Sequence, residues 1–148
     1  MAPASTALPA PHRPGPSSRG RRARSAALTA VITSAAVRDM ADLAATVHTD
    51  TAVLEYIAHL TAATREAPET RLGVSVRGAL AMVRAAKVWA AAEGRNYVLP
   101  DDVLTLAPSV FTHRLVMDPE AEFAGATASA VLDQVLASTA APQQRVNV

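Results

Sequence analysis

From residue 34 onward, apolar residues recur at three- and four-residue steps, which is the spacing of amphipathic helices. The clearest stripe consists of Val53, Tyr56, Ile57 and Leu60. Asp50 stands in front of this stripe and can accept hydrogen bonds from the first amides of a helix. The pattern therefore predicts a helix that Asp50 caps and that ends near Thr64 or Arg65.

A preceding helix is predicted from Ser34, with apolar positions at Val37, Met40, Ala41, Ala44 and Val47. Residues 66–72 contain Pro68 and predict a loop. The longest helix is predicted at 76–93, with Ser75 as its N-cap. Its predicted buried stripe is Ala79, Met82, Val83, Ala86 and Ala90, and Gly94 suits the left-handed turn that ends a helix.

The last third of the chain predicts shorter elements. Tyr97 and Val98 fit a short extended piece, and Pro100 fits the first turn of a fourth helix that Pro108 ends or kinks. Residues 113–117 are predicted to be extended. A last helix is predicted at 126–138, through Ala130, Val131, Gln134 and Val135.

Composition fits helices packed closely together. Half of the 148 residues are hydrophobic but only 3% are aromatic, so Ala, Val and Leu must build the core. The predicted fold is all-α, a small bundle of four to five helices with room for two very short strands. We expect three segments: a disordered Pro/Arg-rich leader at 1–30, the helical domain at 31–142 and a loose tail at 143–148.

Charge is uneven along the chain. The net charge is +1, yet the first 30 residues hold five arginines and no acid, which leaves the rest at −4. An arginine arm for nucleic acid or an acidic surface is one interpretation of the leader. A solvated leader is favoured, because no aromatic residue is interleaved with the arginines. Nucleic acid is therefore not an expected partner.

Several catalytic and metal-binding motifs are missing. The chain's one lysine, Lys87, is not preceded by glycines, so there is no phosphate-binding P-loop. Asp101 and Asp102 follow Pro100 and fit acids at a helix start better than a magnesium pair. The stretch from Gly73 to Arg77 lacks the last glycine of a hydrolase elbow. The histidines show no metal-ligand spacing, there is no cysteine, and no apolar run could cross a bilayer.

One positive feature remains at the start of the longest helix. Ser75 caps it, and Arg77 is its second residue. Helix-start amides and a guanidinium both favour a bound anion. On spacing alone, a capped helix with a surface arginine is the simpler interpretation.

Ordered motifs along the chain resemble a known family. Tyr56-Ile57, Leu60 and Ala63-Thr64-Arg65 resemble Y-[IV]-x-x-L-x-x-A-T-R, and the stretch from Gly73 to Ala79 resembles G-A-S-P-R-A. Residues 94–103 resemble G-R-x-Y-V-x-P-D-D-V, and His113-Arg114-Leu115 resembles H-R-L. The set, over about residues 31–142, resembles the C-terminal lid of the MoxR-family AAA+ ATPases.

The resemblance implies a lid that packs on a nucleotide-binding core and covers ATP. It implies that Arg77 senses the phosphates. We expect Ser75, which caps the same helix, to contribute to this site, and Arg84 and Lys87 to form a supporting basic face. ATP would be bound only with a core, supplied by another chain or lost by truncation. The chain should need no metal of its own and should not hydrolyse ATP alone. Protein clients, a chaperone-like remodelling machine and a cytoplasmic location are further expectations.

Two departures from the family pattern concern helix starts. Val76 stands where the family has proline, and Leu99 stands where it has a polar cap. The second departure should weaken that helix start by up to about 1 kcal/mol. The alternative function is a stand-alone helical interaction module without nucleotide contact, in which Arg77 is dispensable and the face of Arg77, Arg84 and Lys87 binds a protein.

Overall fold

The computed structural model describes residues 31–143. The chain divides into two units, Met1–Ser34 and Ala35–Val148, and the fold described below belongs to the second. The predicted leader at 1–30 and residues 144–148 of the predicted tail lie outside the described residues, so both segments stay predictions. In chain order the elements are α2 (Ser34–Ala45), α3 (Thr51–Glu66), β1 (Thr70–Leu72), α4 (Val76–Ala92), α5 (Pro100–Phe111), a 3-10 turn (Thr112–Arg114), β2 (Val116–Met117), α6 (Pro119–Phe123) and α7 (Ala128–Ser138).

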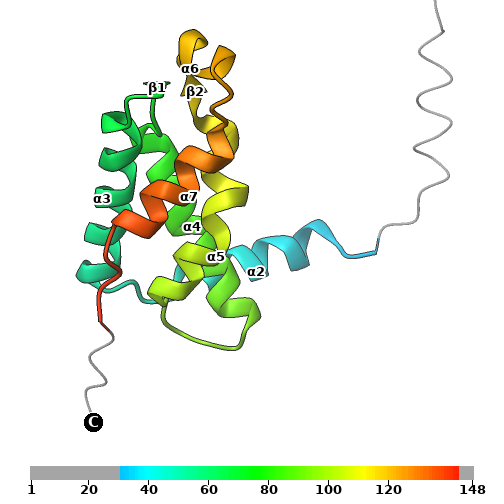
Figure 1. Cartoon of the computed structure of the whole chain (residues 1–148). Coiled ribbons are helices and arrows are strands. Elements are labelled where there is room, and N and C mark those ends of the chain that lie inside the picture. Colours follow the sequence, from blue (N-terminus) through cyan, green and yellow to red (C-terminus); the bar gives the residue numbers. More distant parts are fainter. Residues whose placement is uncertain (1–30, 144–148) are drawn as a thin grey trace, which may run out of the picture. The chain divides into compact units, whose positions relative to one another are not determined.

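Four helices surround one hydrophobic core (Figure 1). α4 packs against α3 and α5, and α7 packs across the same two helices. The hydrophobic side chains that are completely buried are Leu60, Val74, Met82, Ala86, Ala90, Val103, Ala107 and Phe111. The all-α bundle predicted from the sequence is confirmed.

The predicted N-caps of α3 and α4, Asp50 and Ser75, are also confirmed. The Asp50 side chain accepts a hydrogen bond from the Ala52 amide at 2.8 Å, and α3 buries the whole predicted stripe of Val53, Tyr56, Ile57 and Leu60. Gly94 follows α4 with φ +73°, the left-handed conformation that glycine adopts without strain. These signals lie within a few residues of the feature they specify.

Two predicted segments differ from the structure. The predicted loop at 66–72 ends in β1, which pairs antiparallel with β2 in the register Thr70 to Met117 and Leu72 to Val116. The predicted extended segment at 113–117 begins instead with the 3-10 turn, and only Val116–Met117 is a strand. Strands this short show no alternation in the sequence, so each depends on its distant partner.

Prolines explain two further differences. α5 continues past Pro108 to Phe111, so Pro108 does not end its helix. The helix continues although Pro108 has no amide hydrogen to donate to the preceding turn. Pro119, in contrast, opens α6, a helix the sequence analysis missed. The Asp118 side chain caps α6 by accepting from the Glu120 amide at 2.9 Å.

The apolar stripe of α2 is mostly exposed. Val37, Met40 and Leu43 are 49%, 57% and 63% exposed, whereas Ala44 and, just after the helix, Val47 are buried. Periodicity therefore located the helix, but no described element covers most of its apolar residues.

A buried tyrosine in α3 predicts an alkaline loss of stability. Tyr56 is 2% exposed, and its hydroxyl finds no hydrogen-bond partner among the described residues. Burial, and secondarily the Asp101 carboxylate, raises the pKa of Tyr56 above its ordinary value of 10.0. As pH rises, the unfolded chain loses this proton first, so folding stability falls from about pH 10 upward. We expect the Tyr56→Phe variant to lose less stability than the wild-type chain over this alkaline range.

Urea unfolding at about pH 7 and about pH 11 measures this difference. At neutral pH the substitution should be neutral or slightly stabilising, because it removes an unsatisfied buried hydroxyl. Tyr97→Phe is the control, since Tyr97 is 48% exposed. Equal alkaline losses in the wild-type chain and Tyr56→Phe would contradict this account.

Candidate functional site

The start of α4 has the geometry of an N-capped helix. Ser75 has extended backbone angles (φ −77°, ψ 164°), and its hydroxyl accepts from the Gly78 amide at 3.4 Å. The first amides of a helix have no acceptor in a preceding turn, so the amides of Val76 and Arg77 have none within α4. Partial positive charge therefore collects at this helix start.

Arg77 belongs to this first turn and is exposed. Among residues 31–143, no hydrogen-bond or ion-pair partner of its side chain is found. Its guanidinium is therefore free to bind an anion from outside the domain. Val76 in place of the family's proline does not prevent the helix from starting at this residue.

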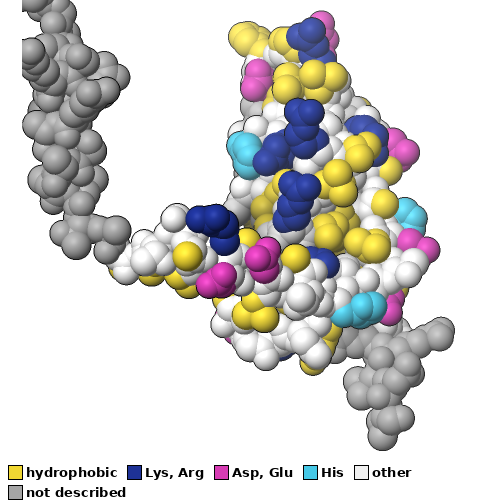
Figure 2. All heavy atoms as spheres, turned by 180° about the vertical axis from the view of Figure 1, so that it is seen from behind, with side chains coloured by type: hydrophobic (Ala, Val, Ile, Leu, Met, Phe, Trp, Pro, Cys, Tyr) yellow, Lys and Arg dark blue, Asp and Glu magenta, His cyan; other side chains and the backbone are white. Residues whose placement is uncertain are grey.

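Arg84 lies two turns further along the same face of α4 and is also exposed. Exposed apolar residues stand beside the two arginines, with Leu80 53% and Val88 56% exposed. In Figure 2, Lys and Arg side chains form a column next to hydrophobic side chains on the side of the domain that lies behind in Figure 1. This side thus offers both charge and apolar area to a partner.

Lys87 has a different environment from the two arginines. Its side chain is half-buried, and its Nζ donates a hydrogen bond to the Ala45 carbonyl at 3.0 Å. Ala45 is the last residue of α2, where helix carbonyls lack intrahelical donors. Lys87 therefore caps α2 and connects it to α4. The sequence does not indicate this contact, because the two residues are 42 positions apart.

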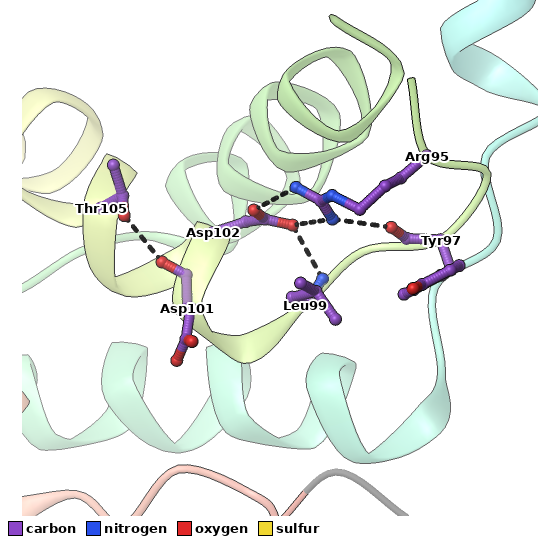
Figure 3. A network of polar contacts seen from close by, with 6 residues as sticks. All are labelled: Arg95, Tyr97, Leu99, Asp101, Asp102 and Thr105. Carbon is purple, nitrogen blue, oxygen red and sulfur yellow. Dashed lines mark hydrogen bonds and ion pairs between the residues drawn. The ribbon is translucent and has the colours of Figure 1, made fainter. Parts of the chain in front are cut away.

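A second polar network fixes the loop between α4 and α5 (Figure 3). The two guanidinium nitrogens of Arg95 reach the two carboxylate oxygens of Asp102 at 2.9 and 2.6 Å. Arg95 also donates to the Tyr97 carbonyl at 3.1 Å, and Asp102 accepts from the Leu99 amide at 2.8 Å. The hydrogen bond to Asp102 is the main reason that the pKa of Arg95 is raised, and it outweighs desolvation.

Asp101 and Asp102 therefore serve a helix start, as the sequence indicated. Asp102 is buried and accepts a hydrogen bond from the backbone amide of the N-cap residue Leu99, as the third helical residue of a capping box does, whereas Asp101 is exposed. The ion pair with Arg95 was missed. Its signal was an arginine seven residues ahead of an acid, across a turn marked by Gly94 and Pro100.

Neither a metal-binding cluster nor a membrane-spanning helix is found between residues 31 and 143. The described part of the chain contains no group of three or more His, Asp or Glu side chains placed to hold a metal ion. Nor does any helix between residues 31 and 143 have the length and apolarity to cross a membrane.

Comparison with known proteins places these features in a family. A family model described as the AAA lid domain matches residues 62–135, half of the chain. The uncharacterized protein YeaC of Bacillus subtilis is 39% identical over 99 residues, which cover 67% of this chain and 31% of YeaC. The chaperone MoxR1 of Mycobacterium tuberculosis is 32% identical over 101 residues, 62% of this chain and 27% of MoxR1.

A solved structure shows the same fold. The crystal structure of a provisionally assigned ATPase from Cytophaga hutchinsonii matches with a TM-score of 0.66 and 28% identity, over 69% of this chain and 34% of that protein. The chain thus spans about a third or less of the length of these relatives. The matched region, the helical fold and the motif order agree, and the chain belongs to the AAA lid domain family, as a lid of the MoxR type.

Proposed function

We propose that this lid contributes to ATP binding and phosphate sensing when it is docked on a nucleotide-binding core. The observation that carries the proposal is Arg77, an exposed arginine in the first turn of α4, where the helix-start amides lack intrahelical acceptors. A phosphate placed there would receive charge-assisted hydrogen bonds from both. ATP binding requires the core, because no P-loop lies in this sequence.

The side of α4 that carries Arg77 is the surface we propose for the core. Arg77 and Arg84 supply charge, and Leu80 and Val88 supply apolar area that is now exposed. A core that covered this side would also remove water from around Arg77, which strengthens its interaction with phosphate. Loss of the γ-phosphate would weaken that interaction and shift the lid toward an open position.

The wider setting follows from the relatives. MoxR1 is named a chaperone, and we propose that this lid serves a similar remodelling machine, with ATP as its nucleotide and proteins as its clients. The core can be in the same polypeptide or in another. The absence of cysteine from the sequence suits a reducing compartment, and we propose the cytoplasm.

Arg77→Ala should weaken ATP binding by the lid and core together. Loss of hydrogen bonds to a charged group corresponds to roughly 10- to 100-fold in affinity. Calorimetry with ATP, on the chain alone and after addition of the core of a MoxR-type relative, measures it. We expect no binding by the chain alone and tighter binding with both parts than with the core alone.

Arg84→Ala is the matched comparison, because Arg84 is an exposed arginine of the same docking surface but lies two turns from the helix-start amides, so its loss removes a surface charge and no phosphate contact. It should change the affinity less than about threefold. If the lid leaves ATP affinity unchanged, or if Arg77→Ala and Arg84→Ala weaken it equally, phosphate sensing at Arg77 is wrong. The first of these results would favour an interaction module without nucleotide contact.

A further inference from the structure

One buried hydroxyl group of α3 holds the loop that leads into α4. Thr64 is completely buried, and its Oγ1 accepts a hydrogen bond from the Val74 amide at 3.0 Å. The same hydroxyl donates to the Thr61 carbonyl at 2.8 Å. A hydroxyl has one hydrogen, so the bond to Thr61 leaves its lone pairs to face the Val74 amide. The two bonds together fix the direction of this contact.

The Val74 amide depends on that hydroxyl. Val74 lies between β1 and α4 and is completely buried. Within the described residues, Thr64 is the acceptor found for this amide. A buried amide without an acceptor is strongly unfavourable, and water has no access here to replace the hydroxyl. The backbone at Val74 must therefore stay where Thr64 can reach it.

Close packing on both sides of Ser75 restricts the same loop. A Cβ added at Gly73 would lie 2.6 Å from the backbone nitrogen of Arg65, the residue after Thr64. A Cβ added at Gly78 would lie 2.5 Å from Cγ1 of Val74. The loop backbone therefore packs in close contact with the end of α3, and the first turn of α4 packs in close contact with Val74. A shift at Val74 would move that first turn.

We propose that Thr64 is a positioning residue, which holds the Val74 amide and thereby sets the first turn of α4 and the place of Arg77. Val74 immediately precedes the N-cap Ser75, and Arg77 follows three residues after Val74. This inference rests on the proposed phosphate-sensing role of Arg77 for its functional consequence. Its structural content can be tested on the chain alone.

Three variants of the full chain separate the hydroxyl from its surroundings. Thr64→Val keeps the shape and removes the acceptor, and Thr64→Ser keeps the acceptor. Thr61→Val is the matched control, because Thr61 is equally buried one turn earlier but its hydroxyl donates only to the Ile57 carbonyl of its own helix. We expect hydrogen exchange of the Val74 amide, followed by NMR, to speed up about tenfold or more in Thr64→Val. The Arg77 amide resonance should shift in the same variant.

The second measurement is ATP affinity with the core added. Thr64→Val should weaken it about tenfold in the wild-type background and not at all in the Arg77→Ala background, because its effect passes through Arg77. Thr64→Ser and Thr61→Val should keep the wild-type affinity, as well as the wild-type exchange rate at Val74. A merely structural role would weaken binding equally in both backgrounds.

The exchange rate, the Arg77 resonance and the ATP affinity each test the positioning role of Thr64. Unchanged exchange at Val74 and an unshifted Arg77 resonance in Thr64→Val would overturn the positioning role, as would equal losses of affinity with and without Arg77. Thr64→Ser should keep the Val74 amide protected from hydrogen exchange. Loss of that protection in the serine variant would overturn the positioning role, whether or not the valine variant folds. If the lid does not affect ATP binding at all, the proposed function fails, while exchange and the Arg77 resonance still decide whether Thr64 sets the start of α4.

Discussion

Phe111→Ala is expected to lower the free energy of unfolding by about 3–5 kcal/mol. Phe111 is the last residue of α5, is completely buried and has the largest side chain among the fully buried residues. The core around it contains short side chains such as Ala86 and Ala107. Because an alanine has no rotamer with which to fill a neighbouring void, most of the cavity should remain. Urea unfolding followed by circular dichroism measures the loss.

The other phenylalanine of the chain provides the control. Phe123 ends α6 and is 97% exposed, so Phe123→Ala should change stability by less than about 0.5 kcal/mol. The two substitutions remove the same atoms, so their difference reflects mainly the burial of Phe111 and the cavity that its loss would leave. Similar losses at both positions would mean that the core does not surround Phe111 as described.

The helices of the bundle could be predicted because their signals are local. Asp50 and Ser75 are polar residues immediately ahead of apolar stripes, and both cap the helix that the pattern indicated. Gly94 marks the end of α4 for a similar reason, since its left-handed conformation is one that other residues rarely adopt. Short-range hydrogen bonding and backbone sterics determine these features.

The bounds of the two strands, which the sequence predicted as a loop and as part of a longer extended segment, depend on distant residues. β1 and β2 are too short to show a period, and each forms because the other lies beside it more than 40 residues away. The exposure of Val37 and Met40 in α2 likewise follows from what packs nearby. Periodicity indicates which face of a helix is apolar, but it does not show whether any element covers that face.

The same distinction applies to the candidate site. Ser75 and Arg77 could be singled out because an N-cap and a basic residue in the first turn are adjacent in sequence. The roles of Thr64 and Lys87 could not be predicted in this way. The amide that donates to the Thr64 hydroxyl lies 10 positions away, and the carbonyl that accepts from the Lys87 ammonium lies 42 positions away. A buried threonine in a helix normally bonds to its own helix, and only the structure shows that Thr64 also holds another segment.

The second large effect is expected at the ion pair between α4 and α5. Arg95→Met should lower the free energy of unfolding by about 3–5 kcal/mol. The Asp102 side chain is 6% exposed, and without the guanidinium it would keep one hydrogen bond, from the Leu99 amide. Removal of one partner thus leaves a buried carboxylate almost unpaired. Urea unfolding near neutral pH measures the loss, with the exposed Arg84→Met as the control.

Asp102→Asn tests the same pair from the other side and should be milder. The asparagine carbonyl can still accept from Leu99, and the Arg95 side chain, 21% exposed, can turn toward water. The double variant should be more stable than Arg95→Met alone, because it contains no buried charge. We expect a coupling energy of at least about 1 kcal/mol from this cycle. If Asp102→Asn instead removed as much stability in the Arg95→Met background as in the wild type, the two side chains would be energetically independent. The 2.6 Å contact would then contribute nothing to holding α4 and α5 together.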